Sequence, residues 1–156
     1  MAANLLLGAL VSFINFGIHA IMTGLIVVAT RRATSVTDDL GVFGRLTVLL
    51  TIAVSVLMVA HGVEVGVWAV FYEWNGVLPN AKISMFEFAF ENYTALGYGE
   101  PVPADGHRLI GPITALNGLL LVGWSVAIIF EVMRMAEVQI GHHSPDTLAA
   151  RRGKKK

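Results

Sequence analysis

The sequence predicts an all-α integral membrane protein with three transmembrane helices. Of its 156 residues, 55% are hydrophobic and 14% are charged, and the mean hydropathy is +0.68. Soluble domains typically have about 45–50% apolar and about 25% charged residues. Apolar stretches at about residues 5–30, 46–72 and 109–133 are each long enough to cross a bilayer, which takes about 20 helical residues. Together these observations favour three spans over a soluble fold.

Basic residues are concentrated on one side of the predicted membrane. All of the 11 lysines and arginines except Lys82 and Arg108 lie in the first loop, near the end of the third span or in the C-terminal tail. Because such residues favour the cytoplasmic side, we expect a multi-pass protein of the cell membrane with its N-terminus outside and its C-terminus inside. The segment 73–108 is then external. Its acidic residues would attract cations.

The first span, at 5–30, is expected to be retained rather than cleaved. It has no basic start, and its apolar run exceeds the about 7–15 residues of a signal-peptide core. Asn15 and His19 lie one turn apart on it, and polar residues in spans usually face protein. We interpret His19 as a hydrogen-bonded packing residue. The absence of cysteine excludes disulfides, thiolate metal sites and cysteine nucleophiles.

The second span contains His61 and Glu64, whose i, i+3 spacing places them on one helix face. A carboxylate at bilayer depth costs about 2–3 kcal/mol, so Glu64 should face the bundle, with His61 as the nearest partner. Two interpretations remain open: a pH-sensitive intramembrane pair, and a satisfied contact between helices. A zinc site has less support, because His19 would be the only intramembrane ligand to add.

A short helix is predicted at 83–95, between the second and third spans. Ser84 is its expected N-cap, with Glu87 three residues later in the capping-box spacing. About twelve helical residues reach only about 18 Å, so this helix would re-enter the membrane without crossing it. Non-helical backbone at membrane depth is tolerated where it is buried or lines a watery cavity. The segment that follows the helix therefore predicts a cavity.

That segment, residues 91–100, reads Glu-Asn-Tyr-Thr-Ala-Leu-Gly-Tyr-Gly-Glu. It resembles the selectivity filter of the potassium-channel pore family, whose Thr-Val-Gly-Tyr-Gly loop binds dehydrated cations through backbone carbonyls. The resemblance assigns the filter to Ala95, Leu96, Gly97, Tyr98 and Gly99. It implies monovalent cation binding, with K⁺ as the transported ion, at the carbonyls of Leu96, Gly97 and Tyr98.

The resemblance also implies supporting residues, and its main departure lies at position 95; Leu96 for Val and Glu100 for Asp are milder departures. Glu91 and Thr94 fall on positions of the pore helix, and Glu100 falls on the acidic residue that closes the filter. Ala95 replaces a threonine whose hydroxyl, in the family, helps to form the innermost ion site. Strict selectivity for potassium over sodium therefore depends on this position.

The resemblance divides the chain into three parts. Residues 46–135 form a pore domain, with an outer helix at 46–72, a pore helix at 83–95, a filter at 95–99 and an inner helix at 109–135. Gly118 and Gly123 are predicted flex points of the inner helix. Residues 1–45 form an additional helix at the periphery and a cytoplasmic loop. Residues 136–156 form a basic cytoplasmic tail, suited to anionic lipid and not to nucleic acid.

The expected function is passive cation conduction with a preference for potassium. Each chain supplies one filter strand, and a ring of carbonyls needs four, so a homotetramer in the lipid bilayer is predicted. We expect no enzymatic activity and no cofactor. Two alternatives are a non-conducting membrane scaffold or accessory subunit that retains a pore-like fold, and a proton-coupled carrier that uses His61 and Glu64.

Overall fold

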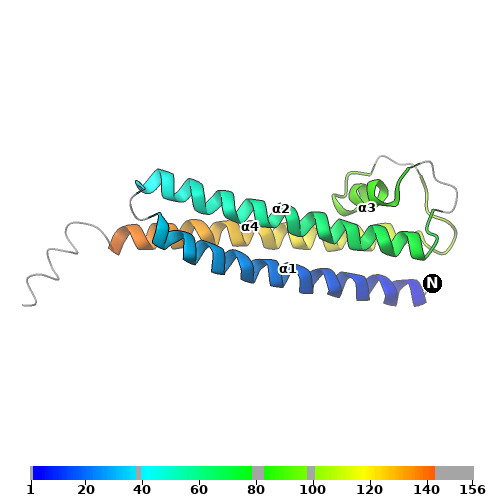
Figure 1. Ribbon diagram of the computed structural model, residues 1–156. Coiled ribbons are helices and arrows are strands. Elements are labelled where there is room, and N and C mark those ends of the chain that lie inside the picture. The colour runs from blue at the N-terminus through cyan, green and yellow to red at the C-terminus, as the bar shows by residue number, and fades with distance from the viewer. Residues whose placement is uncertain (1, 38–39, 79–82, 98–100, 143–156) are drawn as a thin grey trace, which may run out of the picture.

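The computed structural model contains three long helices packed side by side and one short helix near one end of the bundle (Figure 1). It describes residues 2–37, 40–78, 83–97 and 101–142, and these residues contain no strand. The helices are α1 (Ala2–Val36), α2 (Val42–Trp74), α3 (Met85–Tyr93) and α4 (Ile110–His142). The α1–α2 connection and the C-terminal end of α4 lie at one end, and the N-terminus and α3 lie at the other (Figure 1).

Three helices are long and apolar enough to cross a membrane, over Asn4–Thr34, Val42–Trp74 and Ile110–Ala136. The predicted all-α class with three such helices is therefore confirmed. Many large apolar side chains point outward from the bundle, among them Leu6, Phe13, Ile21, Met58 and Phe130. A surface of this kind suits lipid or another chain as its surroundings.

The interior contains two apolar clusters with a polar layer between them. The cluster near α3 includes Trp68, Tyr72, Phe88, Ile110 and Leu121, and the cluster near the α1–α2 connection includes Ile26, Leu49, Leu57 and Val132. The buried polar side chains come from all three long helices: Asn15, His19, Glu64 and Ser125 lie between the clusters, and Asn117 lies at the edge of the cluster near α3. Buried polar groups in a membrane protein need partners inside the protein. The layer therefore couples the helices to one another.

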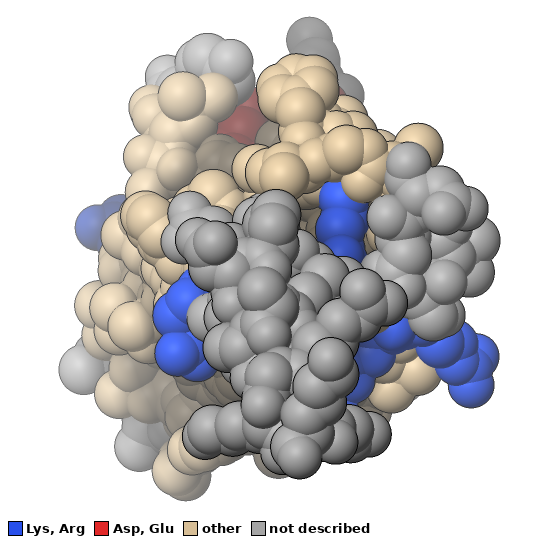
Figure 2. All heavy atoms as spheres, turned by 90° about the vertical axis from the view of Figure 1, so that its left-hand side faces the viewer, with Lys and Arg blue, Asp and Glu red and all other residues tan. Residues whose placement is uncertain are grey.

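Arginine side chains surround the end of the bundle that contains the α1–α2 connection, as Figure 2 shows. Arg31, Arg32 and Arg134 are exposed there, and Arg45 is buried at the start of α2. Arg134 pairs with Glu131 in a two-pronged contact of 2.8 and 2.9 Å. The end that the sequence predicts to be cytoplasmic is thus rich in basic groups. The predicted tail, 136–156, extends beyond residue 142 and lies largely outside the described residues.

Helix α3 begins as its sequence predicts and ends earlier. The Ser84 hydroxyl accepts a hydrogen bond from the backbone N–H of Glu87 (3.1 Å), which confirms the expected N-cap. The helix ends at Tyr93 instead of residue 95. Its nine residues span about 13 Å, which is far less than a bilayer. Helix α3 is in contact with α4. The segment that follows α3 therefore begins beside α4.

Two glycines of α4 allow the C-terminal end of α3 to approach closely. A Cβ at Gly118 would overlap the backbone carbonyl oxygen of Tyr93, and a Cβ at Gly111 would lie 2.6 Å from Asn92 Oδ1. At Gly123, a Cβ would meet no heavy atom of the described residues within 4 Å. The two predicted flex points thus differ in surroundings, because only Gly118 lies against the backbone of another helix. Bending of α4 at either glycine stays a prediction.

We predict that Gly118→Ala destabilises the folded protein and that Gly123→Ala does not. The added methyl group at Gly118 must displace the backbone of Tyr93, and overpacking of this kind costs about 1–3 kcal/mol. At Gly123 the gain in helix propensity is about 1 kcal/mol. Unfolding of the purified variants in mixed detergent micelles measures both effects. Equal stability of the two variants would contradict the close contact.

Candidate functional site

The predicted filter segment begins at the surface of the single chain, directly after α3. The structure describes Ala95, Leu96 and Gly97 of the segment, whereas Tyr98, Gly99 and the supporting Glu100 lie outside the described residues. Thr94 is exposed and donates a hydrogen bond to the backbone carbonyl of Phe90 (2.9 Å). Leu96 is 58% exposed. In one chain this segment is therefore open to a partner or to solvent.

The backbone turns through the left-handed region at Ala95 and again at Gly97, with φ values of 55° and 56°. At Ala95 the cause is the end of the helix. The N–H of Leu96 donates to the carbonyl of Glu91 (3.0 Å), and the N–H of Ala95 donates to that of Asn92 (2.9 Å). These are the two bonds of a Schellman motif, in which glycine usually occupies the left-handed position. Ala95 holds this position with a side chain, which costs about 1–2 kcal/mol.

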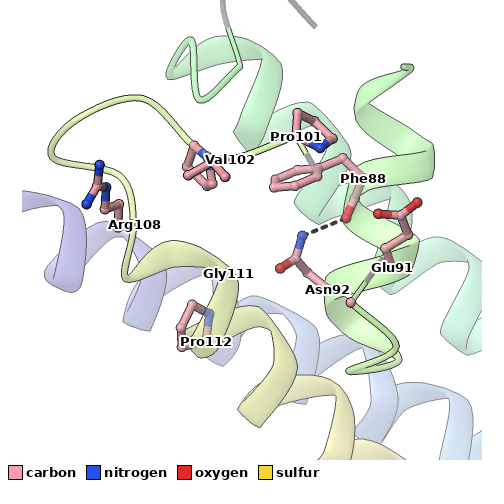
Figure 3. Close-up of a pocket in the computed structure, with 10 residues that line it drawn as sticks. Phe88, Glu91, Asn92, Pro101, Val102, Arg108, Gly111 and Pro112 are labelled. Atoms are coloured by element: carbon pink, nitrogen blue, oxygen red, sulfur yellow. Dashed lines mark hydrogen bonds between the residues drawn. The ribbon is translucent and has the colours of Figure 1, made fainter. Parts of the chain in front are cut away.

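A hollow of about 200 Å³ lies behind the start of the segment (Figure 3). It lies between α3, the connection 101–103 and the beginning of α4. Glu91 and Arg108 line it from opposite sides, so that an acidic and a basic side chain border the same space (Figure 3). Asn92 also faces it and donates to the carbonyl of Phe88 (2.8 Å). A space of this size with polar groups at its border can hold several waters.

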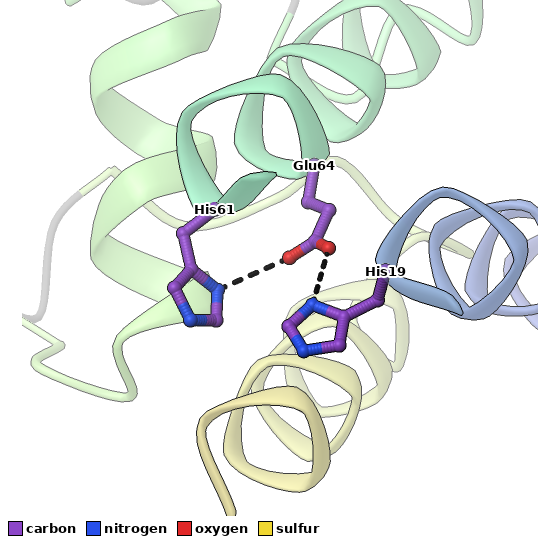
Figure 4. Close-up of side chains that lie close together, drawn as sticks. All are labelled: His19, His61 and Glu64. Atoms are coloured by element: carbon purple, nitrogen blue, oxygen red, sulfur yellow. Dashed lines mark hydrogen bonds and ion pairs between the residues drawn. The ribbon is translucent and has the colours of Figure 1, made fainter. Parts of the chain in front are cut away.

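The second feature is a cluster of polar side chains around Glu64, in the middle of the bundle. The Glu64 side chain is wholly buried. One carboxylate oxygen lies 2.8 Å from His19 Nδ1, and the other lies 3.1 Å from His61 Nδ1 (Figure 4). The Tyr93 hydroxyl donates to the second oxygen (2.5 Å). The predicted His61–Glu64 contact is present, and α1 and α3 each add a further partner.

A second ring of hydrogen bonds surrounds this cluster. The Ser125 hydroxyl on α4 lies 2.9 Å from His61 Nε2 and 3.4 Å from His19 Nε2. The Asn15 amide donates to the backbone carbonyl of Glu64 (3.2 Å) and to Asn117 Oδ1 (3.0 Å). The indole N–H of Trp68 donates to the same Asn117 oxygen (3.0 Å). All four helices thus meet in one network.

Sequence reasoning found only part of this cluster. It paired His61 with Glu64, and it interpreted His19 as a hydrogen-bonded packing residue without identifying Glu64 as its partner. It did not assign Tyr93 or Ser125 to the cluster. Tyr93 is the last residue of α3, two positions before Ala95, so the cluster connects directly to the base of the predicted filter.

Comparison with known proteins places this chain in a family. The model of a family described as "Ion channel" matches residues 46–135, which is more than half of the chain. The chain belongs to this ion-channel family. The resemblance to the two-transmembrane, potassium-channel type of pore is thereby confirmed. Comparisons with curated proteins and with solved structures gave no match.

The ion-channel match includes α2 from residue 46, all of α3, and α4 as far as residue 135, and α1 lies outside it. The Glu64 cluster therefore combines residues of the matched region with two side chains, Asn15 and His19, from the additional helix. The candidate filter and the cluster are connected through the chain at the end of α3. Tyr93 lies between them.

We predict that Ala95→Gly stabilises the protein, whereas Ala89→Gly inside α3 destabilises it. Glycine removes the about 1–2 kcal/mol cost of a left-handed side chain at position 95. Within a helix it costs about 0.5–1 kcal/mol instead. Ala95→Thr should destabilise, because a β-branched residue is strongly disfavoured at positive φ. Detergent unfolding of the variants tests this order, and destabilisation by Ala95→Gly would contradict the left-handed turn.

Proposed function

We propose that the protein is a homotetrameric cation channel that conducts potassium passively through four copies of the segment 95–99. One observation carries the proposal. In a chain of the ion-channel family, a capped helix too short to span ends against α4, and a segment ending in Gly-Tyr-Gly follows it. That arrangement suits a pore helix that re-enters the membrane and delivers a filter strand.

The described start of the segment has the backbone properties that a carbonyl-lined filter needs. A dehydrated cation is bound by successive carbonyl oxygens that face the same side, and residues in the left-handed region make such an alignment accessible. Ala95 and Gly97 both adopt positive φ. The C-terminal end of α3 also directs the negative end of a helix dipole toward the segment, which favours a cation there.

The outer surface of the chain supports assembly into a larger oligomer. Leu96 is exposed, and α4 carries further exposed apolar side chains, among them Leu116, Leu119, Leu120 and Phe130. A tetramer with α4 toward the axis would cover part of this surface and bring four filter segments together. The arginine-rich end in Figure 2 would face the cytoplasm of a cell membrane, with both α3 and the N-terminus outside.

Flux measurements test the proposed activity. Protein reconstituted into liposomes with a potassium gradient should release potassium without any other energy source, and mass measurement in nanodiscs should give four chains. Gly97→Val should abolish the flux, because valine disfavours the positive φ of this position. Protein-free liposomes provide the background.

Three outcomes would contradict the proposal. A monomer would exclude a four-stranded filter. A tetramer without flux would favour the non-conducting scaffold or accessory subunit. Transport that stops when a proton gradient is removed would favour a carrier built on His61 and Glu64.

Selectivity should depend on position 95. We expect Ala95→Ser to raise the permeability of potassium relative to sodium, because its hydroxyl restores an oxygen at the innermost ion site without a β-branch at positive φ. Ala95→Gly, which adds no oxygen, is the matched control and should leave the ratio near that of the parent. Reversal potentials with potassium on one side and sodium on the other measure the ratio. Equal ratios for the serine and glycine variants would exclude this role of the hydroxyl.

A further inference from the structure

We propose that His19, His61 and Glu64 form a binding site for a divalent transition-metal ion, with Zn²⁺ as the best match. Each residue offers one ligand atom, and these atoms all lie within 4.8 Å of one another. Two imidazoles and one carboxylate form a ligand set that zinc uses in proteins. The site does not depend on ion conduction, since it lies within a single chain and joins α1 to the pore domain.

The ligand atoms already converge (Figure 4). Both histidines turn Nδ1 toward the Glu64 carboxylate, at 2.8 and 3.1 Å. In a tetrahedral site with bonds of about 2.0–2.1 Å, ligand atoms are roughly 3.3 Å apart. Side-chain movements of roughly 1–1.5 Å therefore bring the set to zinc geometry. The Tyr93 hydroxyl lies 2.7 Å from His61 Nδ1. Its oxygen can therefore serve as the fourth ligand.

Hydrogen-bond counting around Ser125 also favours an added cation. If both neutral histidines donate their Nδ1 protons to Glu64, both Nε2 atoms are acceptors. They face the same Ser125 hydroxyl, at 2.9 and 3.4 Å, which has only one proton to donate. A metal bound at both Nδ1 atoms moves both ring protons to Nε2. The Ser125 oxygen, with two lone pairs, then accepts from both rings.

The surroundings provide the outer support that metal ligands usually have. Metal-binding histidines commonly donate their other ring N–H to an oxygen, which fixes the ring orientation; Ser125 is placed for this role. Asn15 holds the backbone carbonyl of Glu64, and the ring of Trp124 lies 5.3 Å from that of His19. His19 and Glu64 are fully buried, while the His61 side chain is 20% exposed. His61 is therefore the least covered of the three ligands in the single chain.

Metal binding here would connect the additional helix to the base of α3. His19 comes from α1, outside the ion-channel match, and the other two ligands come from α2, within it. Tyr93, the last residue of α3, contacts Glu64 through its hydroxyl and so links the site to the end of α3. A bound ion would stabilise this junction as a unit, since a ligand that binds only the folded state adds to its stability.

Cobalt and zinc titrations of the purified protein test the site. After treatment with a chelator, the parent should bind one Co²⁺ per chain with the visible absorption of tetrahedral cobalt, and Zn²⁺ should displace it. His19→Gln and Glu64→Gln each remove a ligand and should weaken binding by more than about 100-fold, while Ser125→Ala should weaken it by about 10–100-fold as an outer-shell change.

Two matched controls separate loss of the site from loss of the fold. His107→Gln removes a histidine from the connection before α4, and Tyr72→Phe removes a buried hydrogen bond to Thr114 (2.6 Å) elsewhere in the bundle; both should bind metal like the parent. Metal-free unfolding measurements identify any variant that does not fold. Failure of the parent to bind Co²⁺ or Zn²⁺ would overturn the proposal, as would unchanged binding in folded His19→Gln and Glu64→Gln.

Discussion

A carboxylate buried in the middle of a membrane bundle is the constraint on which the rest of this structure depends. Glu64 has no exposed surface, and an unpaired charge in such surroundings would cost several kcal/mol. Three hydrogen-bond partners meet it, and each comes from a different helix: His19 from α1, His61 from α2 and Tyr93 from α3. Satisfying all three at once sets the register of α1 against α2 and the depth at which α3 ends.

Tyr93 transmits this constraint to the candidate filter. Its hydroxyl is bound by Glu64 on one side, and its backbone carbonyl rests against Gly118 of α4 on the other, where no side chain would fit. The chain then turns through the left-handed conformation at Ala95. A polar bond and a close backbone contact thus hold the residue from which the filter segment departs. The start of the candidate filter and the packing of the bundle therefore depend on the same two contacts.

Much of the fold could be predicted because membrane spans, helix caps and i, i+3 pairs are local patterns. Composition predicts three helices, Ser84 predicts the start of α3, and spacing pairs His61 with Glu64. The contact between His19 and Glu64 depends on how α1 is rotated against α2, which no local pattern specifies. Gly118 reads equally as a bend or as a close contact. The left-handed turn was missed because Ala95 occupies a position where glycine is the usual signal.

The buried polar layer also changes the view of α1 as a peripheral addition. Asn15 and His19 are both wholly buried. Asn15 donates hydrogen bonds to Asn117 and to the backbone carbonyl of Glu64, and His19 is hydrogen-bonded to the Glu64 carboxylate. A two-span pore without α1 would expose this face of α2 and α4 to lipid, leaving Glu64 with fewer donors than a buried charge requires. Glu64 and the polar side chains of α1 therefore depend on each other. Without its partner, each would be a buried polar group with an unsatisfied hydrogen bond.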